Sequence, residues 1–332
     1  MSKLYKIILL LGLLLTSPSQ ALSNDFNLWL DNFKSVAIDN GISQNTIDKA
    51  LKNAKFLPNV IKYDRYQPEF YEDTLTYIKK RTNSRKVKNG SRLFFKDKKL
   101  IISIEKKFLV EKELLLALMG IETNFGKYLG KMDIISSLAT LSFDKRRSIF
   151  FTNELITLLK LIDNNVIDYN LLYGSWAGAY GNFQFMPSTI NKYALDFDNN
   201  SSIELTKKAD SFASAANYMN KIGWKKDKPC YKKIELKNNI PQKYLNTSAK
   251  KIKNKKKYKF FKKFIINSNL YNFDDNEIVG IITPDSDIIP NSKNLSPAYV
   301  VFENYELILK WNRSLRFALA VCTLKDKIKN EI

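Results

Sequence analysis

The chain has 332 residues, of which 45% are hydrophobic and 13% aromatic, so it can form two or three folded domains and is not largely disordered. It contains no histidine and two cysteines, which excludes Ser-His-Asp and Cys-His catalysis and a zinc site made by its own cysteines. The formal net charge of +21 favours a polyanionic partner such as nucleic acid, an anionic membrane or a cell wall, although A/T-rich codon usage explains abundant lysine equally well.

The N-terminus has the pattern of a cleaved signal peptide. Two lysines precede an apolar run, and the small residues Ser19 and Ala21 stand where signal peptidase would cut. The run is too short to span a bilayer and no cysteine follows it, so we expect no stable membrane anchor. Residues 1–21 are therefore predicted to be removed, leaving a mature protein that begins near Leu22 in a bacterial envelope. Export argues against nucleic acid as a partner.

Helical periodicity dominates the next ninety residues or so. Aromatic and aliphatic side chains recur at helical spacing from residue 26 onward, and Ser43 has the position of an N-cap for a second helix. Residues 64–70, DRYQPEF, are predicted to form a loop because Pro68 interrupts any helix. Beyond them, residues 91–108 carry one long helical stripe.

The strongest predicted helix lies within residues 110–126, VEKELLLALMGIETNFG, and Gly126 suits a left-handed C-terminal cap. Its last acid, Glu122, follows eight uncharged residues. A lone carboxylate at the end of an apolar run is costly to bury unless it is paired or used. Glu122 is therefore a candidate catalytic acid, and the alternative is an ion pair with Arg146 or Arg147.

Residues 174–188, GSWAGAYGNFQFMPS, combine glycine turns with aromatic rings and the polar side chains of Ser175, Gln184 and Ser188. They lack the signatures of a phosphate loop and of a dinucleotide fold. Neutral hydrogen-bonding groups among aromatic rings suit a carbohydrate, whose hydroxyls need directional partners and whose ring faces need flat apolar surfaces. An aromatic core beside a turn explains the same pattern.

Residues 196–207, DFDNNSSIELTK, resemble a calcium-binding loop. The loop has Ser201 where a glycine is required and Lys207 where a bidentate acid is required. The sequence therefore favours no bound metal, and calcium is kept as the weaker alternative. The candidate calcium ligands are Asp196, Asp198, Asn200 and Glu204.

The C-terminal third changes character. Residues 225–263 are rich in lysine and are expected to be exposed, with little regular structure. Short strands are predicted within 278–302, followed by an amphipathic helix or helix pair. In an oxidising envelope Cys230 and Cys322 could form a disulfide, but their spacing leaves this open.

Several of these segments resemble the lytic murein transglycosylase B family in order and spacing. They are GIETNFGKYLG, SLATLSFDKRR, FFTNEL, GSWAGAYGNFQFMPS, YALDFD and SAANYMNKIGW, with DRYQPEF before them and PAYVVFENYELILKWNRSLRFALAV after them. The resemblance covers nearly all of the mature chain and is weak only in the lysine-rich region.

The resemblance implies a mainly α-helical fold, with a lysozyme-like catalytic core, flanking helical segments and a small C-terminal β element. The expected regions are a signal peptide (1–21), an N-terminal helical region (22–110), the catalytic core (111–224), a lysine-rich variable region (225–275) and a C-terminal strand and helix segment that completes the groove (276–332).

The resemblance also implies an activity. Such enzymes cleave the β-1,4 bond between N-acetylmuramic acid and N-acetylglucosamine in peptidoglycan glycan strands, without water and without a required cofactor, and leave a 1,6-anhydromuramoyl end. The implied location is the periplasm of a Gram-negative bacterium. The family's catalytic glutamate falls on Glu122, and its tyrosine near the C-terminus is replaced by Phe317. The implied substrate-binding residues are Tyr77, Arg147, Ser175, Gln184, Tyr218, Trp311 and Phe317.

The residues themselves favour the same chemistry. Desolvation and the helix dipole both disfavour the anionic form of a carboxyl at a buried helix C-terminus, so Glu122 is suited to donate a proton. Neither residues 120–130 nor residues 174–188 contain a second acid, whereas most glycosidases use two. This favours capture by the substrate's own C6 hydroxyl. A hydrolytic muramidase and a non-catalytic peptidoglycan-binding or scaffold protein remain as alternatives.

Overall fold

The computed structural model describes residues 18–67, 71–286 and 295–332. Over these residues the protein is mainly α-helical, as expected, with fourteen α-helices and two small sheets. None of these helices is long and apolar enough to cross a membrane. The expected signal peptide lies outside the described residues except for its last four positions, which begin the first helix.

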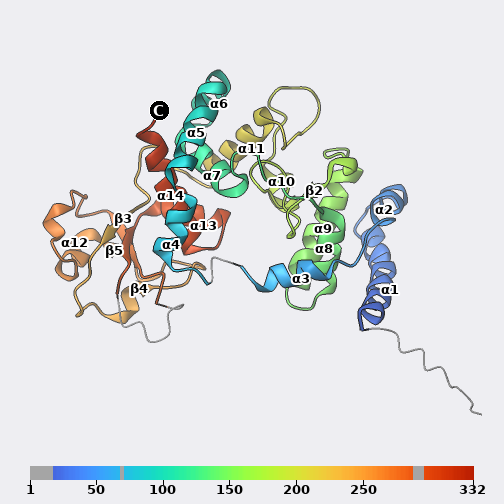
Figure 1. Ribbon diagram of the computed structural model, residues 1–332, viewed down its shortest axis with the longest axis horizontal. Helices are drawn as coiled ribbons and strands as arrows, with labels where there is room; N and C mark the ends of the chain where they lie inside the picture. Colours follow the sequence, from blue (N-terminus) through green and yellow to red (C-terminus); the bar gives the residue numbers. More distant parts are fainter. Residues whose placement is uncertain (1–17, 68–70, 287–294) are drawn as a thin grey trace, which may run out of the picture.

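One end of the molecule is built from the first three helices and two later ones (Figure 1). Ser43 caps the second helix as predicted, because its hydroxyl accepts a hydrogen bond from the Thr46 backbone N–H. Residues 64–70 were predicted to form a loop, but Asp64 and Arg65 are the last two residues of the third helix. Residues 68–70 lie outside the described residues. These helices are α1 (Pro18–Asp39), α2 (Gln44–Leu51), α3 (Pro58–Arg65), α8 (Ile134–Phe143) and α9 (Ser148–Asp163).

The centre of the molecule holds α4 (Thr74–Arg81), α5 (Ser84–Lys96), α6 (Lys98–Phe108), α7 (Lys112–Thr123), α10 (Pro187–Tyr193) and α11 (Lys208–Lys221). The prediction of one helical segment over residues 91–108 is wrong, since the chain leaves helical geometry at Asp97. Asp97 ends α5 and precedes α6, and its carboxylate accepts a hydrogen bond from Lys208 at 2.5 Å. Aspartate favours helix ends over helix interiors, and the ion pair fixes this break.

Helix α7 forms the centre of the main hydrophobic core. It packs against α5, α6, α11 and α14 (Leu315–Lys329), and residues 114–120 are buried on every side. The predicted cap at Gly126 is wrong by two residues: Asn124 is the left-handed C-cap. Asparagine tolerates this conformation, and Phe125 and Gly126 continue it with φ of 62° and 79°. The chain therefore turns sharply at residues 124–126, just after the end of α7.

The lysine-rich region is a folded domain, so the expectation of little regular structure is wrong. Its lysines alternate with buried residues such as Ile234, Leu236 and Phe261, which form a hydrophobic core of their own. The strands are β3 (Tyr231–Ile234), β4 (Leu245–Asn246), β5 (Lys256–Lys257), β6 (Ile278–Ile282) and β7 (Ala298–Val301), in the order β3-β7-β6-β4 with β5 also paired to β6, beside α12 (Tyr258–Phe261). The expected boundary after residue 275 therefore falls inside one sheet.

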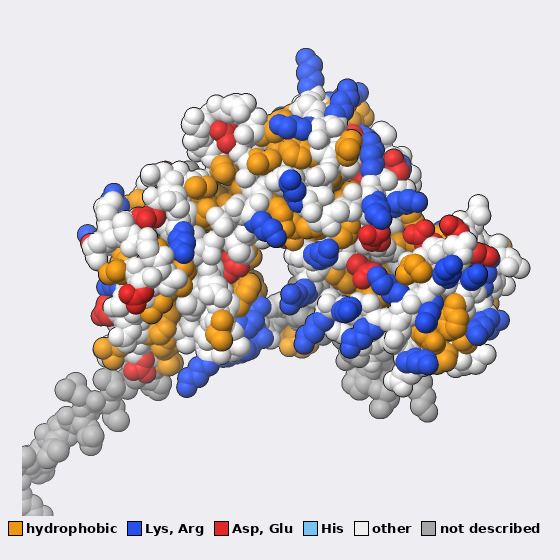
Figure 2. All heavy atoms as spheres, turned by 180° about the vertical axis from the view of Figure 1, so that it is seen from behind, with side chains coloured by type: hydrophobic (Ala, Val, Ile, Leu, Met, Phe, Trp, Pro, Cys, Tyr) orange, Lys and Arg blue, Asp and Glu red, His pale blue; other side chains and the backbone are white. Residues whose placement is uncertain are grey.

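The chain ends in the helix pair α13 (Glu303–Trp311) and α14, as predicted. Cys230, just before β3, forms a disulfide with Cys322 of α14, which resolves the pairing that the sequence left open. The space-filling view shows an opening through the molecule, between the end that carries α8 and α9 and the end that carries the sheet (Figure 2).

Loss of the disulfide should destabilise the protein. Reduction, or the double variant Cys230→Ser/Cys322→Ser, should lower the free energy of unfolding by about 2–4 kcal/mol, because the bond restricts the unfolded chain. The bonded residues are 92 positions apart. Urea unfolding with and without a reductant measures the effect. Reductant should leave the double variant unchanged, and an identical midpoint for oxidised and reduced wild type would contradict the prediction.

Candidate active site

The segment after α7 and the glycine-rich segment 174–188 are joined by backbone pairing. The short strands β1 (Met132–Asp133) and β2 (Tyr173–Gly174) pair antiparallel. A Cβ atom at Gly130 would lie 1.9 Å from the Gly174 carbonyl oxygen, so only glycine permits this approach. The concentration of glycine in these segments thus brings two distant parts of the chain into contact.

Side chains strengthen the same junction. Gln184 donates through Nε2 to the Leu129 carbonyl oxygen at 3.1 Å, and its own backbone is left-handed, with φ of 50°. Thr123 donates through Oγ1 to the Asn182 carbonyl oxygen at 2.8 Å. The chain that follows Glu122 is therefore held against the glycine-rich segment.

Glu122 lies half-buried near the end of α7 and meets an aromatic cluster. Its Oε1 accepts a hydrogen bond from the Trp311 indole N–H at 2.9 Å. The Trp311 ring stacks on Tyr218 with ring centroids 5.0 Å apart, and it meets the rings of Phe183 and Phe185 edge-on. The structure thus joins the predicted acid to two predicted substrate-binding residues, although Trp311 is far from Glu122 in the sequence.

A lysine that sequence reasoning missed lies beside this acid. Lys86 of α5 donates through Nζ to the Gly120 carbonyl oxygen at 2.6 Å and interacts electrostatically with Glu122. Burial, and next the positive charge of Arg81, lower the pKa of Lys86 to about 8, while Glu122 opposes this shift. Lys86 is therefore mostly charged at neutral pH. In the sequence, the one sign of this position is that Lys86 lies four residues before Gly90, on the same face of α5.

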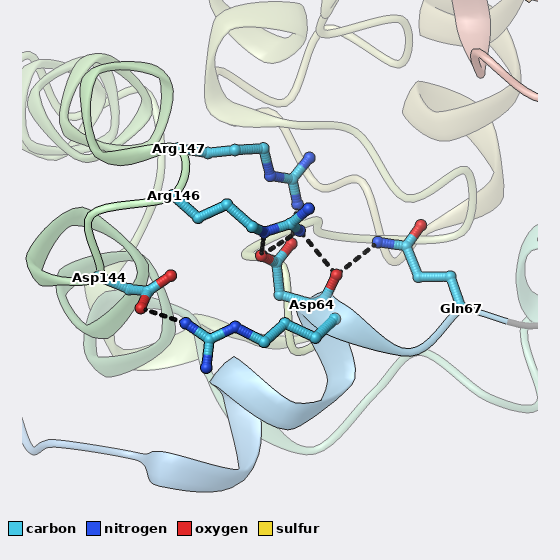
Figure 3. Close-up of polar contacts among 6 residues, drawn as sticks. Asp64, Gln67, Asp144, Arg146 and Arg147 are labelled. Atoms are coloured by element: carbon cyan, nitrogen blue, oxygen red, sulfur yellow. Dashed lines mark hydrogen bonds and ion pairs between the residues drawn. The ribbon is translucent and has the colours of Figure 1, made fainter.

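The two arginines that the sequence offered as alternative partners of Glu122 have another acid as their ion-pair partner. Both form ion pairs with Asp64, which is 2% exposed, and Arg146 also donates to the Asp64 carbonyl oxygen at 2.7 Å (Figure 3). Gln67 donates to the same carbonyl oxygen. The side chain of Arg147 remains 39% exposed, so Asp64 orients this guanidinium without enclosing it.

Tyrosine side chains among the predicted residues are largely enclosed. Tyr218 donates through its hydroxyl to the Lys310 carbonyl oxygen at 3.0 Å, and burial raises the pKa of Tyr218 to about 12. Tyr77 is 2% exposed, and the Arg81 guanidinium lies 3.5 Å from its ring centroid. Tyr218 therefore holds a neutral hydroxyl in a fixed position near physiological pH.

The other predicted residues differ in how open they are. Ser175 accepts a hydrogen bond from the Ala179 backbone N–H and is half-buried. Phe317 is 3% exposed within α14. Ser188 donates to Glu154 at 2.6 Å at the start of α10, so its hydroxyl is engaged by that carboxylate. Of these three residues, Phe317 is the one that is buried, whereas Ser175 is half-buried and Ser188 is exposed.

In the loop that resembles a calcium site, acidic side chains already accept hydrogen bonds from backbone N–H groups of the same segment. Carboxylate oxygens of Asp196, Asp198 and Asp210 lie within 4.8 Å of one another. Asp210 accepts backbone N–H groups from Phe197 and Glu204, each at 2.8 Å, and Asp196 accepts others from its own loop. The residue at the twelfth position is a lysine, which begins α11 as its N-cap. Without an acid at that position, this donor set fits calcium poorly.

Comparisons with known proteins agree on one family. The sequence matches the transglycosylase SLT domain over residues 25–326. Membrane-bound lytic murein transglycosylase B of Escherichia coli K12 is 42% identical over 118 residues, 35% of this chain. The match spans about a third (33%) of that relative's length.

Solved structures match over most of the chain. SltB3 from Pseudomonas aeruginosa, in complex with NAG-anhNAM-pentapeptide, is 28% identical with a TM-score of 0.79, over 92% of this chain and 79% of that one. Lytic transglycosylase Slt35 of E. coli, in complex with calcium, is 24% identical with a TM-score of 0.74, over 93% of this chain and 94% of that one. The likeness to Slt35 shows a shared fold.

Calcium should have little effect on stability. Lys207 stands where a closing carboxylate is needed, and a ligand stabilises a fold in proportion to its occupancy. The melting temperature should be the same in millimolar calcium and in chelator. A rise of several degrees with calcium that Asp210→Asn abolishes would contradict this and show that Asp210 completes a metal site.

Proposed function

The chain belongs to the transglycosylase SLT domain family, and from this we propose that it is a lytic transglycosylase that cleaves the β-1,4 bond between N-acetylmuramic acid and N-acetylglucosamine in peptidoglycan and forms a 1,6-anhydromuramoyl end. One observation carries the proposal: Glu122 ends a buried apolar helix and meets the indole of Trp311 in an aromatic cluster. The complex of SltB3 with NAG-anhNAM-pentapeptide supports the choice of substrate.

In the first proposed step, protonated Glu122 donates its proton to the glycosidic oxygen. The bond between C1 of N-acetylmuramic acid and that oxygen breaks, the alcohol of the neighbouring sugar leaves, and the acetamido group stabilises the cation at C1. The proton transfer leaves a carboxylate on Glu122. The Trp311 N–H and the positive charge of Lys86 are in place to stabilise this anion.

In the second step, the C6 hydroxyl of the same muramic acid attacks C1, and the Glu122 carboxylate takes the hydroxyl proton. The new C6–O–C1 bond closes the anhydro ring, and Glu122 returns to its protonated form. Capture within one molecule is favoured because the reacting groups are already close together. One carboxyl can therefore serve both steps, consistent with a single acid in the two motifs at the site.

We assign the substrate-binding roles by chemistry. The half-buried ring of Trp311 offers an apolar surface to a sugar face, and the exposed part of Arg147, held by Asp64, suits an anionic group on the strand. Tyr77 and Phe317 lie deeper and would shape the site from behind. The complete set proposed to bind or shape the binding of substrate is Tyr77, Arg147, Ser175, Gln184, Tyr218, Trp311 and Phe317.

The proposed setting is the periplasm of a Gram-negative bacterium, with export by the predicted signal peptide and no stable membrane anchor. The strong positive charge suits work on an anionic cell wall. The proposed partners are peptidoglycan glycan strands, without nucleic acid, and the reaction as written needs no cofactor.

Glu122→Gln should abolish cleavage and leave the fold intact. The two side chains are nearly the same size, and glutamine still accepts the Trp311 hydrogen bond, but it cannot donate an acidic proton. General acid–base catalysis contributes about a hundred- to ten-thousand-fold, and a residue that serves both steps should lie at the upper end. Release of soluble muropeptides from purified peptidoglycan measures the loss, with thermal unfolding and wall binding as controls. Undiminished release by Glu122→Gln would mean that the catalytic acid lies elsewhere.

A further inference from the structure

The lysine-rich domain carries a large excess of positive charge. Residues 231–277 contain thirteen lysines, four acids and no arginine. Within the described part of the chain, two of these lysines are neutralised by ion pairs, Lys262 with Asp275 and Lys255 with Glu306 of α13. Lysine is a strongly hydrated point charge, whereas arginine suits bidentate recognition of a single carboxylate or phosphate. The composition therefore favours an extended anionic surface over one anionic group.

Two of the other lysines lie over aromatic rings. The Lys243 Nζ is 5.3 Å from the ring centroid of Tyr244, and the Lys263 Nζ is 4.9 Å from that of Phe260. The two rings meet edge-on, with their centroids 5.1 Å apart, and both are half-buried in the domain. Both lysines are exposed, and no described carboxylate forms an ion pair with either of them. Their charges are therefore available to a partner.

Exposed aliphatic side chains follow directly in the chain. Leu270 is 79% exposed and Ile266 is 37% exposed. Both are held in place by the fold, because the Ile266 backbone N–H donates to the Glu235 carbonyl oxygen and the Leu270 N–H to that of Asn267, each at 2.9 Å. The domain therefore presents aliphatic groups to solvent close to unpaired lysines, a combination that is typical of interaction surfaces.

These side chains come from α12 and the turns on either side of it. The hydroxyl of Tyr258 in α12 donates to the Ser268 carbonyl oxygen at 3.5 Å, which joins the turn before Leu270 to that helix. Figure 2 shows hydrophobic side chains among lysine and arginine side chains at the end of the molecule that carries the sheet. We call this surface the α12 face and define it by Lys243, Tyr244, Phe260, Lys263, Ile266 and Leu270.

The α12 face is separate from the candidate active site. In Figure 1, α12 lies on the outer side of the sheet, and the sheet stands between it and α13, which carries Trp311. A partner on the α12 face would therefore leave Glu122 and the opening beside it accessible.

We propose that the α12 face docks reversibly on an anionic lipid surface, with its lysines at the headgroups and Leu270 and Ile266 at the boundary of the acyl chains. Lysines are attracted to anionic headgroups, and aromatic rings with one polar edge suit the same depth. Aliphatic side chains gain free energy on leaving water for the acyl boundary, whereas a hydrated anionic polymer offers them no such environment. This favours lipid over the cell wall as the partner of this face.

The test uses the mature chain from Leu22, because the predicted signal peptide is itself apolar and would bind lipid. Sedimentation with vesicles of phosphatidylglycerol and phosphatidylcholine in equal parts measures the affinity. Vesicles of phosphatidylcholine alone lack the anionic headgroup. The wild type should bind the mixed vesicles, more weakly as salt is added, and should not bind phosphatidylcholine alone.

The charge variant is Lys243→Gln/Lys263→Gln. It should bind the mixed vesicles roughly thirtyfold more weakly, since each lysine near an anionic membrane contributes about a factor of five. The matched control, Lys52→Gln/Lys160→Gln, removes the same charge from exposed positions at the end of α2 and on α9, at the other end of the molecule. The control should bind as the wild type does.

The apolar variant is Leu270→Ser. It should bind the mixed vesicles about tenfold more weakly, because transfer of a leucine side chain out of water is worth at least that factor. Its control is Leu28→Ser in α1, where the leucine is 66% exposed, and this variant should bind unchanged. Thermal unfolding checks that each variant is folded.

Equal losses by the two lysine pairs would assign the binding to overall charge and overturn the proposal, as would unchanged binding by Leu270→Ser. Retention on purified peptidoglycan that Lys243→Gln/Lys263→Gln weakens as much as vesicle binding would assign the α12 face to the cell wall instead. The proposed cleavage is judged separately, because Glu122→Gln leaves the α12 face unchanged and should bind vesicles like the wild type.

Discussion

The hydrogen bond from Trp311 to Glu122 is the constraint around which the candidate site is organised. It joins residues 189 positions apart, at the ends of α13 and α7. Glu122 is held in this position because α7 is apolar and enclosed, with α14 packed along it. The disulfide of Cys322 ties α14 to the sheet, and the turn at Asn124 leads the chain to the glycine-rich wall. The position of one carboxylate thus depends on most of the chain.

Local patterns in the sequence predicted the parts that depend on neighbouring residues. The apolar run before Glu122, the cap at Ser43 and the two strands β6 and β7 all follow from residue type and spacing over a few positions. The resemblance of ordered motifs extended this to the family and the fold. The motifs could indicate the family and the fold because each is a contiguous segment and the spacing between the segments is kept.

Features that depend on distant partners could not be predicted in the same way. No local pattern marks Lys86, because its contact with Gly120 is made between two helices. Asp64 was predicted to lie in a loop, and its ion pairs with both arginines depend on a distant part of the chain. The prediction of little regular structure in the lysine-rich domain was wrong for a related reason. Its lysines dominate the composition, while its core residues are spaced singly among them and become visible as a core only in the sheet.

The central claim is that Glu122 acts with the substrate's own C6 hydroxyl rather than with water. Mass spectrometry of the muropeptides that the wild-type protein releases from purified peptidoglycan tests this most directly. The account predicts anhydro products about 18 Da lighter than those of a hydrolytic muramidase, since ring closure replaces the addition of water. Hydrated products would contradict it and identify the protein as a muramidase.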